Sequence, residues 1–300
     1  MIVVPFGLLL VLLGVLAVRR RTAGSVALAG VPVAWTPTVV VRAPRRWPVV
    51  RDLGRVEARK LVGHPMVVFG GLIALLSTGV GAFEPGPQAY FELTGSGGIG
   101  LYVPPLVFLA THLNVTRARR AGTGEVLAST ATTPVDRTLA FCFAGVYVAA
   151  GVLAFVVVGT AFYAVVGTDM PRTPGPFELL LLPASVLGAV TLGTMVGRWL
   201  PWRGVGPAAL VVLVAATLWI TGSAVDQPLF VSFVDLVDWE ATGHVDIAVH
   251  VPAAHALYLF GLDAMAVVGA VLHDTRTRVW WVLGFAAVVW TAAMGAWQVS

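Results

Sequence analysis

An all-α, polytopic integral membrane protein is the fold class that this 300-residue sequence predicts, and two observations carry the prediction. Hydrophobic residues make up 58% of the chain and charged residues only 11%, with a mean hydropathy of +0.87. Average soluble proteins carry about 25% charged residues, so this chain has too few charges to cover a soluble globule of its size. The apolar residues also gather in long runs, and the cations fall between those runs as they do in membrane proteins.

Eight apolar runs have the length of membrane-spanning helices. A helix needs roughly 20 mostly apolar residues to cross a hydrocarbon layer about 30 Å thick, and about 17 to 25 are tolerated. In chain order the runs are 2–18, 66–83, 99–115, 139–159, 179–196, 205–221, 256–272 and 279–297. We therefore predict about eight transmembrane helices.

The positions of the cations predict the orientation, because short loops rich in Lys and Arg stay cytoplasmic. If the N-terminus is external and the runs alternate in direction, 18 of the 19 cations lie on the cytoplasmic side and only Arg172 lies outside. Nine of the 15 acidic residues then lie outside. Both termini of this multi-pass cell-membrane protein are thus predicted to be external.

Residues 1–65 are predicted to form an N-terminal part with the first span and a cytoplasmic linker. The run 2–18 has an alternative interpretation as a signal-peptide core, but no cation precedes it and three arginines follow, which is the wrong charge order. The segment 22–41 is apolar but interrupted by Pro32 and Pro37. We interpret it as an interfacial or re-entrant linker.

An amphipathic helix is predicted from Arg51 to Gly63. Charged residues there alternate with Leu53, Val56 and Leu61, a pattern typical of helices that lie on a membrane surface. His64-Pro65 is expected to end this helix before the next span. A basic loop flanking the membrane is the alternative on charge alone.

The cytoplasmic connection 116–138 has the most structured pattern among the loops. Thr133 precedes Pro134 at the first helical position and Asp136 at the third, which indicates the start of a helix. Residues 125–129 are predicted to form a short helix that contacts the membrane or a partner.

On the external side, the connection 222–255 mixes apolar residues with acids and predicts a helical segment in the outer leaflet.

The chain lacks the residues that several kinds of chemistry need. A P-loop needs Gly-Lys-Ser/Thr, because the lysine must reach the phosphate. Lys60 is the only lysine and Leu61 follows it, so the chain cannot bind ATP through a Walker motif. We therefore expect that it is not an enzyme itself and has no cofactor, and that any ATPase is a partner. Cys142 is the only cysteine, which excludes an internal disulfide or a Cys-pair zinc site, and it is expected to be a small packing residue. Topology explains the cations, so we expect no nucleic-acid partner.

Three histidines and four acids of the external region have side chains that bind divalent metals, but their spacing matches no known site. They are His244, His250, His255, Asp235, Asp238, Glu240 and Asp246. We interpret them as polar residues of a wetted external loop and predict no metal site.

Asp263 lies about eight residues inside the seventh span. A carboxylate within a membrane is costly and faces the bundle interior or a wet cavity, so a role in a transport pathway or relay is one hypothesis. The other is an aspartate at a helix contact that is locally hydrogen-bonded or protonated. Gly193 and Gly197 form a G-x-x-x-G face, which predicts close packing of helices.

Segments 119–127 (Arg-Arg-Ala-Gly-Thr-Gly-Glu-Val-Leu) and 133–139 (Thr-Pro-Val-Asp-Arg-Thr-Leu) resemble the coupling region of ABC-2 type permeases of ATP-binding-cassette exporters. This resemblance implies a six-span permease core over 66–272 and an additional C-terminal span in 273–300. It also implies that a cytoplasmic coupling helix docks on an ATPase. The residues it assigns to ATPase coupling are Arg119, Arg120, Gly122, Thr123, Glu125, Pro134 and Arg137. The chain departs from the family pattern by an extra span at each end.

The expectation is therefore a permease subunit of an ABC exporter, embedded in the lipid bilayer and driven by a separate ATP-binding-cassette ATPase. It would act as a homodimer or with a sister permease, on a substrate that the sequence does not reveal. An ion-coupled secondary transporter or channel that uses Asp263 is the alternative. A membrane enzyme with a metal on its external histidines ranks lowest.

Overall fold

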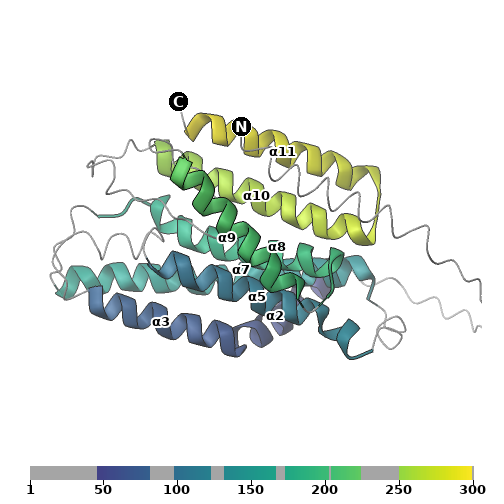
Figure 1. The fold of residues 1–300 in the computed structure, drawn as a ribbon, viewed down its shortest axis with the longest axis horizontal. Coiled ribbons are helices and arrows are strands. Elements are labelled where there is room, and N and C mark those ends of the chain that lie inside the picture. The colour runs from purple at the N-terminus through teal and green to yellow at the C-terminus, as the bar shows by residue number, and fades with distance from the viewer. Residues whose placement is uncertain are drawn as a thin grey trace, which may run out of the picture. The chain divides into compact units, whose positions relative to one another are not determined.

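Helices are the only regular elements in the part of the chain that the computed structural model describes, namely residues 46–81, 98–122, 132–166, 173–202, 204–223 and 250–298. In chain order they are α2 (Arg46–Val62), α3 (Pro65–Gly81), α5 (Gly98–Arg120), α7 (Pro134–Val166), the 3-10 turn η1 (Glu178–Leu180), α8 (Leu181–Trp199), α9 (Val205–Ser223), α10 (His250–Asp274) and α11 (Arg278–Gln298) (Figure 1). The chain divides into two compact units, Met1–Val49 and Val50–Ser300. The contacts that follow all lie within the second unit.

Four stretches of helix are long and apolar enough to cross a membrane. They are Pro134–Val166, Glu178–Trp199, Pro252–Asp274 and Arg278–Gln298. A fifth is added if α2 and α3, which meet at a bend of 66°, are counted as one broken span. This all-helical, multi-span pattern is compatible with a multi-pass membrane protein, whereas the count of eight spans stays a prediction.

Each predicted span that falls on described residues is helical. The span 2–18, the linker 22–41 and the short helix at 125–129 lie outside the described residues, as do residues 224–249 of the external connection. Helices α5 and α7 extend beyond their apolar parts, so the connection predicted at 116–138 is confined to residues 121–133. The helices extend past their apolar parts because polar residues at helix ends can satisfy the terminal backbone groups.

Helix α8 is the central element, with α5, α7 and α10 packed around it (Figure 1). In the most apolar part of Glu178–Trp199, which includes α8, 83% of the residues are buried, compared with 11% in the corresponding part of α11. Small residues allow this crowding. On the α7 side, for example, a Cβ built on Gly145 would lie 2.9 Å from Cδ1 of Leu187.

The G-x-x-x-G face of α8 packs against α5, as predicted. A Cβ built on Gly193 would lie 2.9 Å from the carbonyl oxygen of Phe108, and one on Gly197 would lie 3.0 Å from Cγ1 of Val115. Real Cβ atoms essentially never come as near as 2.9 Å, so the Gly193 position requires glycine for α5 and α8 to meet at this separation. At Gly197 the contact would be tight, and the Val115 side chain would have to give way. Cys142 is buried and free, as expected of a packing residue.

Helix α2 ends at the predicted break, and one of its faces packs against the bundle. The buried positions are Val50, Gly54, Ala58 and Leu61, whereas Val56 is exposed. Gly54 decides this face, because the absence of a side chain lets α2 approach Phe143 of α7 closely. The apolar pattern predicted the helix correctly, and its place on a membrane surface stays a prediction.

Candidate functional site: a charged cluster at the helix ends

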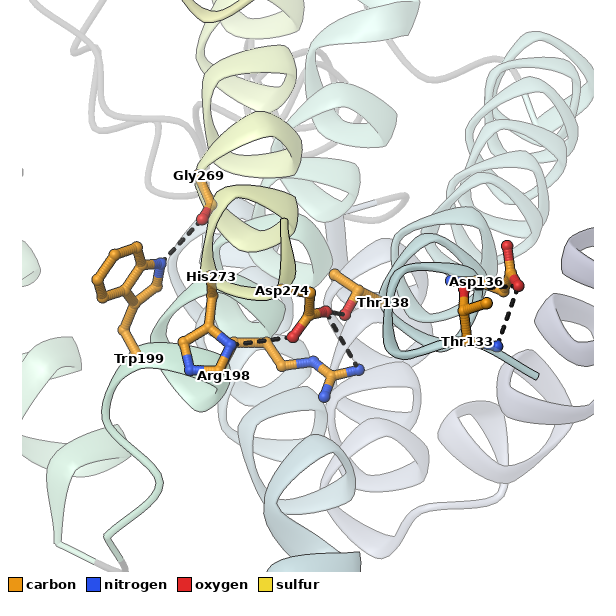
Figure 2. Close-up of polar contacts among 8 residues, drawn as sticks. All are labelled: Thr133, Asp136, Thr138, Arg198, Trp199, Gly269, His273 and Asp274. Atoms are coloured by element: carbon orange, nitrogen blue, oxygen red, sulfur yellow. Dashed lines mark hydrogen bonds and ion pairs between the residues drawn. The ribbon is translucent and has the colours of Figure 1, made fainter. Parts of the chain in front are cut away.

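The carboxylate of Asp274 is the centre of a polar cluster where α7 begins and where α8 and α10 end (Figure 2). Thr138 Oγ1 of α7 donates a hydrogen bond to Asp274 Oδ2. Nδ1 of His273 lies 3.0 Å from Asp274 Oδ1, and Nη2 of Arg198 from α8 lies 4.0 Å from Oδ2. One side chain therefore has partners on three helices. We call Thr138, Arg198, His273 and Asp274 the Asp274 cluster.

The partners of Asp274 compensate for an unfavourable position. The C-terminus of a helix carries a partial negative charge, so an acid in the last residue of α10 is repelled by its own helix. Its side chain is also only 5% exposed, which removes most of its contact with water. A buried carboxylate is tolerated when hydrogen bonds and a cation satisfy it, and Thr138, His273 and Arg198 do so here.

Trp199 strengthens the junction between α8 and α10. Its Nε1 donates a hydrogen bond of 2.8 Å to the carbonyl oxygen of Gly269, and its ring meets the ring of His273 edge-on at 5.5 Å (Figure 2). The last turns of the two helices are thus held together next to the Asp274 cluster.

The start of α7 is fixed by a reciprocal cap, which confirms the predicted start signal. Thr133 donates to Asp136 Oδ2 from its backbone nitrogen at 3.1 Å and from Oγ1 at 2.7 Å (Figure 2). In return the backbone nitrogen of Asp136 donates to Thr133 Oγ1 at 3.1 Å. This capping box satisfies amide groups that would otherwise have no partner, and Pro134 occupies the first helical position.

The end of α5 also has a defined geometry. Gly122 has a φ of +66°, and its backbone nitrogen donates to the carbonyl oxygen of Arg119 at 3.3 Å. Glycine adopts this left-handed conformation without steric cost, and it commonly ends helices in this way. Arg119 and Arg120 are exposed in the last turn of α5, where Arg120 donates to the carbonyl oxygen of Leu113.

The structure assembles only part of the residue set that the resemblance assigned to ATPase coupling. Arg119 and Arg137 lie near the Asp274 cluster, since the charges of both act on the Arg198 guanidinium. Thr123 and Glu125 lie outside the described residues. The sequence reasoning used Arg198 only as a topology charge and did not single out Thr138, His273 or Asp274. Because these polar residues directly flank apolar runs, the sequence indicated that they lie at helix ends, but not that those ends meet.

Asp263 lies deep in the bundle, apart from the Asp274 cluster. It precedes Asp274 by 11 positions of α10, which is about 16 Å at 1.5 Å per residue. The residue is 4% exposed, and neither carboxylate oxygen has a hydrogen-bond partner among the described residues. Within the described part of the chain, therefore, the hypothesis of a local hydrogen bond is not supported.

No metal site is present among the described residues, where no group of three His, Cys, Asp or Glu side chains converges. His255 does not lie on a wetted loop, as was expected, but is fully buried within α10. Its Nδ1 lies 3.4 Å from Oε1 of Gln298 on α11. Helix α10 begins earlier than its apolar run, and this brings His255 into the helix interface. His244 and the four acids lie outside the described residues.

Comparisons with protein-family models, with curated proteins and with solved structures find no match to this chain.

Proposed function

We propose that the chain is the transmembrane permease subunit of an ABC-type exporter, moving an unidentified substrate with energy from a separate ATPase. One observation supports this most: each end of the connection 121–133 leads directly into a helix that contacts another helix of the bundle. At one end α5 packs on α8, and at the other α7 is bonded to α10. A partner that pushes on this connection would act directly on the helices around α8.

The contacts offer a path for such a movement. The capping box of Thr133 and Asp136 makes the start of α7 a defined, rigid point, and Thr138 lies about one turn further along. From there the hydrogen bond to Asp274 leads to α10, and the ion pair leads to Arg198 of α8. Binding and release of ATP on the partner would thus shift α7 together with α8 and α10.

The energy source in this proposal is a second protein. The only lysine, Lys60, is followed by leucine, so the chain has no Walker lysine of its own to hold ATP. A homodimer or a pair with a sister permease in the lipid bilayer would enclose the pathway. Arg119, Arg120, Gly122, Thr123, Glu125, Pro134 and Arg137 remain the proposed ATPase-coupling residues.

Co-purification tests the proposal. The tagged protein is isolated from its native membrane in mild detergent, co-purifying chains are identified, and ATP hydrolysis is measured. We expect a stoichiometric ATP-binding partner that is lost in Glu125→Lys. Asp246→Lys, the same charge reversal on the predicted external side, serves as the control and should retain the partner. A protein recovered alone under gentle conditions would contradict the proposal.

A second candidate function is favoured by Asp263. Its carboxyl group is buried and has no hydrogen-bond partner in the part of the chain that the structure describes. Such groups within a membrane carry protons or ions in secondary transporters. In that case an imposed proton gradient would drive substrate movement into or out of proteoliposomes that contain the chain without any ATPase. Asp263→Asn would abolish this transport. Gradient-independent transport by the purified chain would exclude this candidate.

A further inference from the structure

His64 caps the start of α3 at the sharp bend that separates this helix from α2. Its Nδ1 accepts a hydrogen bond of 3.3 Å from the backbone nitrogen of Met66. Its carbonyl oxygen accepts hydrogen bonds from the backbone nitrogens of Val67 at 2.9 Å and Val68 at 3.0 Å. With Pro65 at the first helical position, His64 is the N-cap residue of α3, a place that Ser, Thr, Asp or Asn usually occupies.

Pro65 forces the break between the two helices. It has no backbone N–H, so α2 cannot continue through it, and the carbonyl oxygen of Leu61 accepts a hydrogen bond of 3.0 Å from the backbone nitrogen of His64 instead. The two helices diverge by 66° at this point. Proline fixes only its own φ, so the side-chain cap on Met66 is a further restraint on the direction in which α3 leaves the bend.

The bend joins two separate contacts with the bundle. On α2, Nε of Arg55 donates a hydrogen bond of 3.0 Å to the hydroxyl group of Tyr147 on α7. On α3, a Cβ built on Gly70 would lie 3.3 Å from Cδ1 of Leu106, so α3 packs closely on α5. A change in the angle at His64 would therefore shift α2 against α7 or α3 against α5.

Only a neutral ring can accept the hydrogen bond from Met66. In one neutral tautomer of histidine Nδ1 carries a lone pair, and protonation turns this acceptor into a second N–H donor. The start of a helix also carries a partial positive charge, which repels an imidazolium ion. Protonation of His64 therefore removes the cap and places a cation in an unfavourable position.

The charged groups around the bend do not offset this effect. Helix α3 has no charged side chain, and both acids of α2, Asp52 and Glu57, already contact cations of their own helix. The other ionisable side chains in the second half of α5 and the first turn of α7 are His112, Arg117, Arg119, Arg120, Asp136 and Arg137. Asp136 is the one acid among these six, and the capping box of α7 already occupies it.

We propose that the bend between α2 and α3 is an acid-sensitive hinge, which the neutral ring of His64 holds at a fixed angle and which loosens when this ring is protonated. Histidine ordinarily titrates near about pH 6.5, so the hinge is held in neutral solution and is released as the solution becomes acidic. On the predicted cytoplasmic side of the membrane, acidification of the cell interior would be the signal.

A distance between spin labels on the two helices tests the hinge. Labels are attached at Val56→Cys on α2 and Leu76→Cys on α3, two exposed positions, and Cys142→Ala removes the native thiol. Pulsed electron paramagnetic resonance on the full chain in lipid nanodiscs then measures the label-to-label distance distribution from about pH 8 to about pH 5. We expect the distribution to be narrow at the upper limit and at least twice as wide at the lower one, with a midpoint within about one unit of pH 6.5.

His64→Asn is the matched control. Asparagine is a preferred N-cap residue, and its side-chain oxygen accepts a hydrogen bond at every pH of this series. The distribution should therefore stay narrow throughout. The other five of the six histidines remain unchanged in this variant, so it also controls for their titration.

Three results would overturn the proposal. The first is a distribution that does not change with pH in the labelled chain that keeps His64. The second is equal broadening in His64→Asn, which would assign the change to another group. The third is a narrow distribution at about pH 8 in His64→Ala, which has no acceptor and should be broad at every pH. If His64→Ala fails to fold, the first two comparisons decide.

Discussion

Thr138 on α7 donates a hydrogen bond to Asp274 on α10 across 136 positions of the chain. Arg198 of α8 reaches the same carboxylate, so one acidic side chain joins three helices at one end of the bundle. The connection between α5 and α7 is thereby linked to α8 and α10 through a few side chains. This link supports the proposed coupling, and it is open to direct measurement.

The hydrogen bond of Thr138 is expected to contribute measurably to stability. Thr138→Val keeps the shape of the side chain but removes the hydroxyl, leaving Asp274 with fewer partners. We expect the free energy of unfolding in detergent to fall by about 1 kcal/mol, in the range of hydrogen bonds between membrane helices. Thr160→Val is the matched control, because Thr160 Oγ1 donates to the carbonyl oxygen of Val156 in its own helix, and it should change stability less. Equal losses would mean that the interhelical bond contributes nothing.

Glycine is expected to be essential where α8 meets α5. Gly193→Ala would place a methyl group 2.9 Å from the backbone oxygen of Phe108, and a backbone atom cannot move aside cheaply. Overpacking of this kind costs about 1–3 kcal/mol, which thermal unfolding followed by tryptophan fluorescence would detect. Gly151→Ala on α7 should be neutral or slightly stabilising, since its Cβ would meet nothing within 4 Å. A drop in melting temperature for Gly151→Ala alone would contradict the assignment.

The sequence was sufficient to predict the helices that the structure describes and the start of α7, because those depend on local patterns. Apolar runs predict helices, and Thr133-Pro134 marks a helix start whatever the tertiary context. The G-x-x-x-G face of Gly193 and Gly197 likewise predicted close packing, but not that α5 is the partner.

The Asp274 cluster could not be predicted, because no local pattern specifies which helix ends meet. Thr138, Arg198 and Asp274 are separated by long connections, and only the three-dimensional arrangement shows that they share one carboxylate. Helix α2 shows the same limit, because its apolar pattern did not indicate that Gly54 approaches Phe143 of α7 closely.

The capping box is expected to act as a unit. Thr133→Ala and Asp136→Ala each remove one half of a reciprocal pair, and each should lower stability by about 1 kcal/mol. The double variant should lose less than the sum of the single losses, because the two side chains act through the same bonds. Additive losses in this double-mutant cycle would show that the two residues stabilise α7 independently.

The two buried acids of α10 are expected to respond in opposite ways to the same substitution. Asp274→Val leaves Thr138 and Arg198 without their partner, so the free energy of unfolding should fall by about 2–4 kcal/mol. Asp263→Val removes a carboxyl group that has no hydrogen-bond partner among the described residues, so stability should stay unchanged or rise by about 1 kcal/mol. Chemical unfolding of both variants in one detergent would measure this contrast. A carboxyl group that lowers the stability of a protein persists where function requires it. If Asp263 lies on the transport pathway, the Asp263→Val protein should therefore keep its stability and lose transport. Full transport in a stable Asp263→Val protein would remove Asp263 from the mechanism, whereas a strong loss of stability would mean that its side chain has a structural partner.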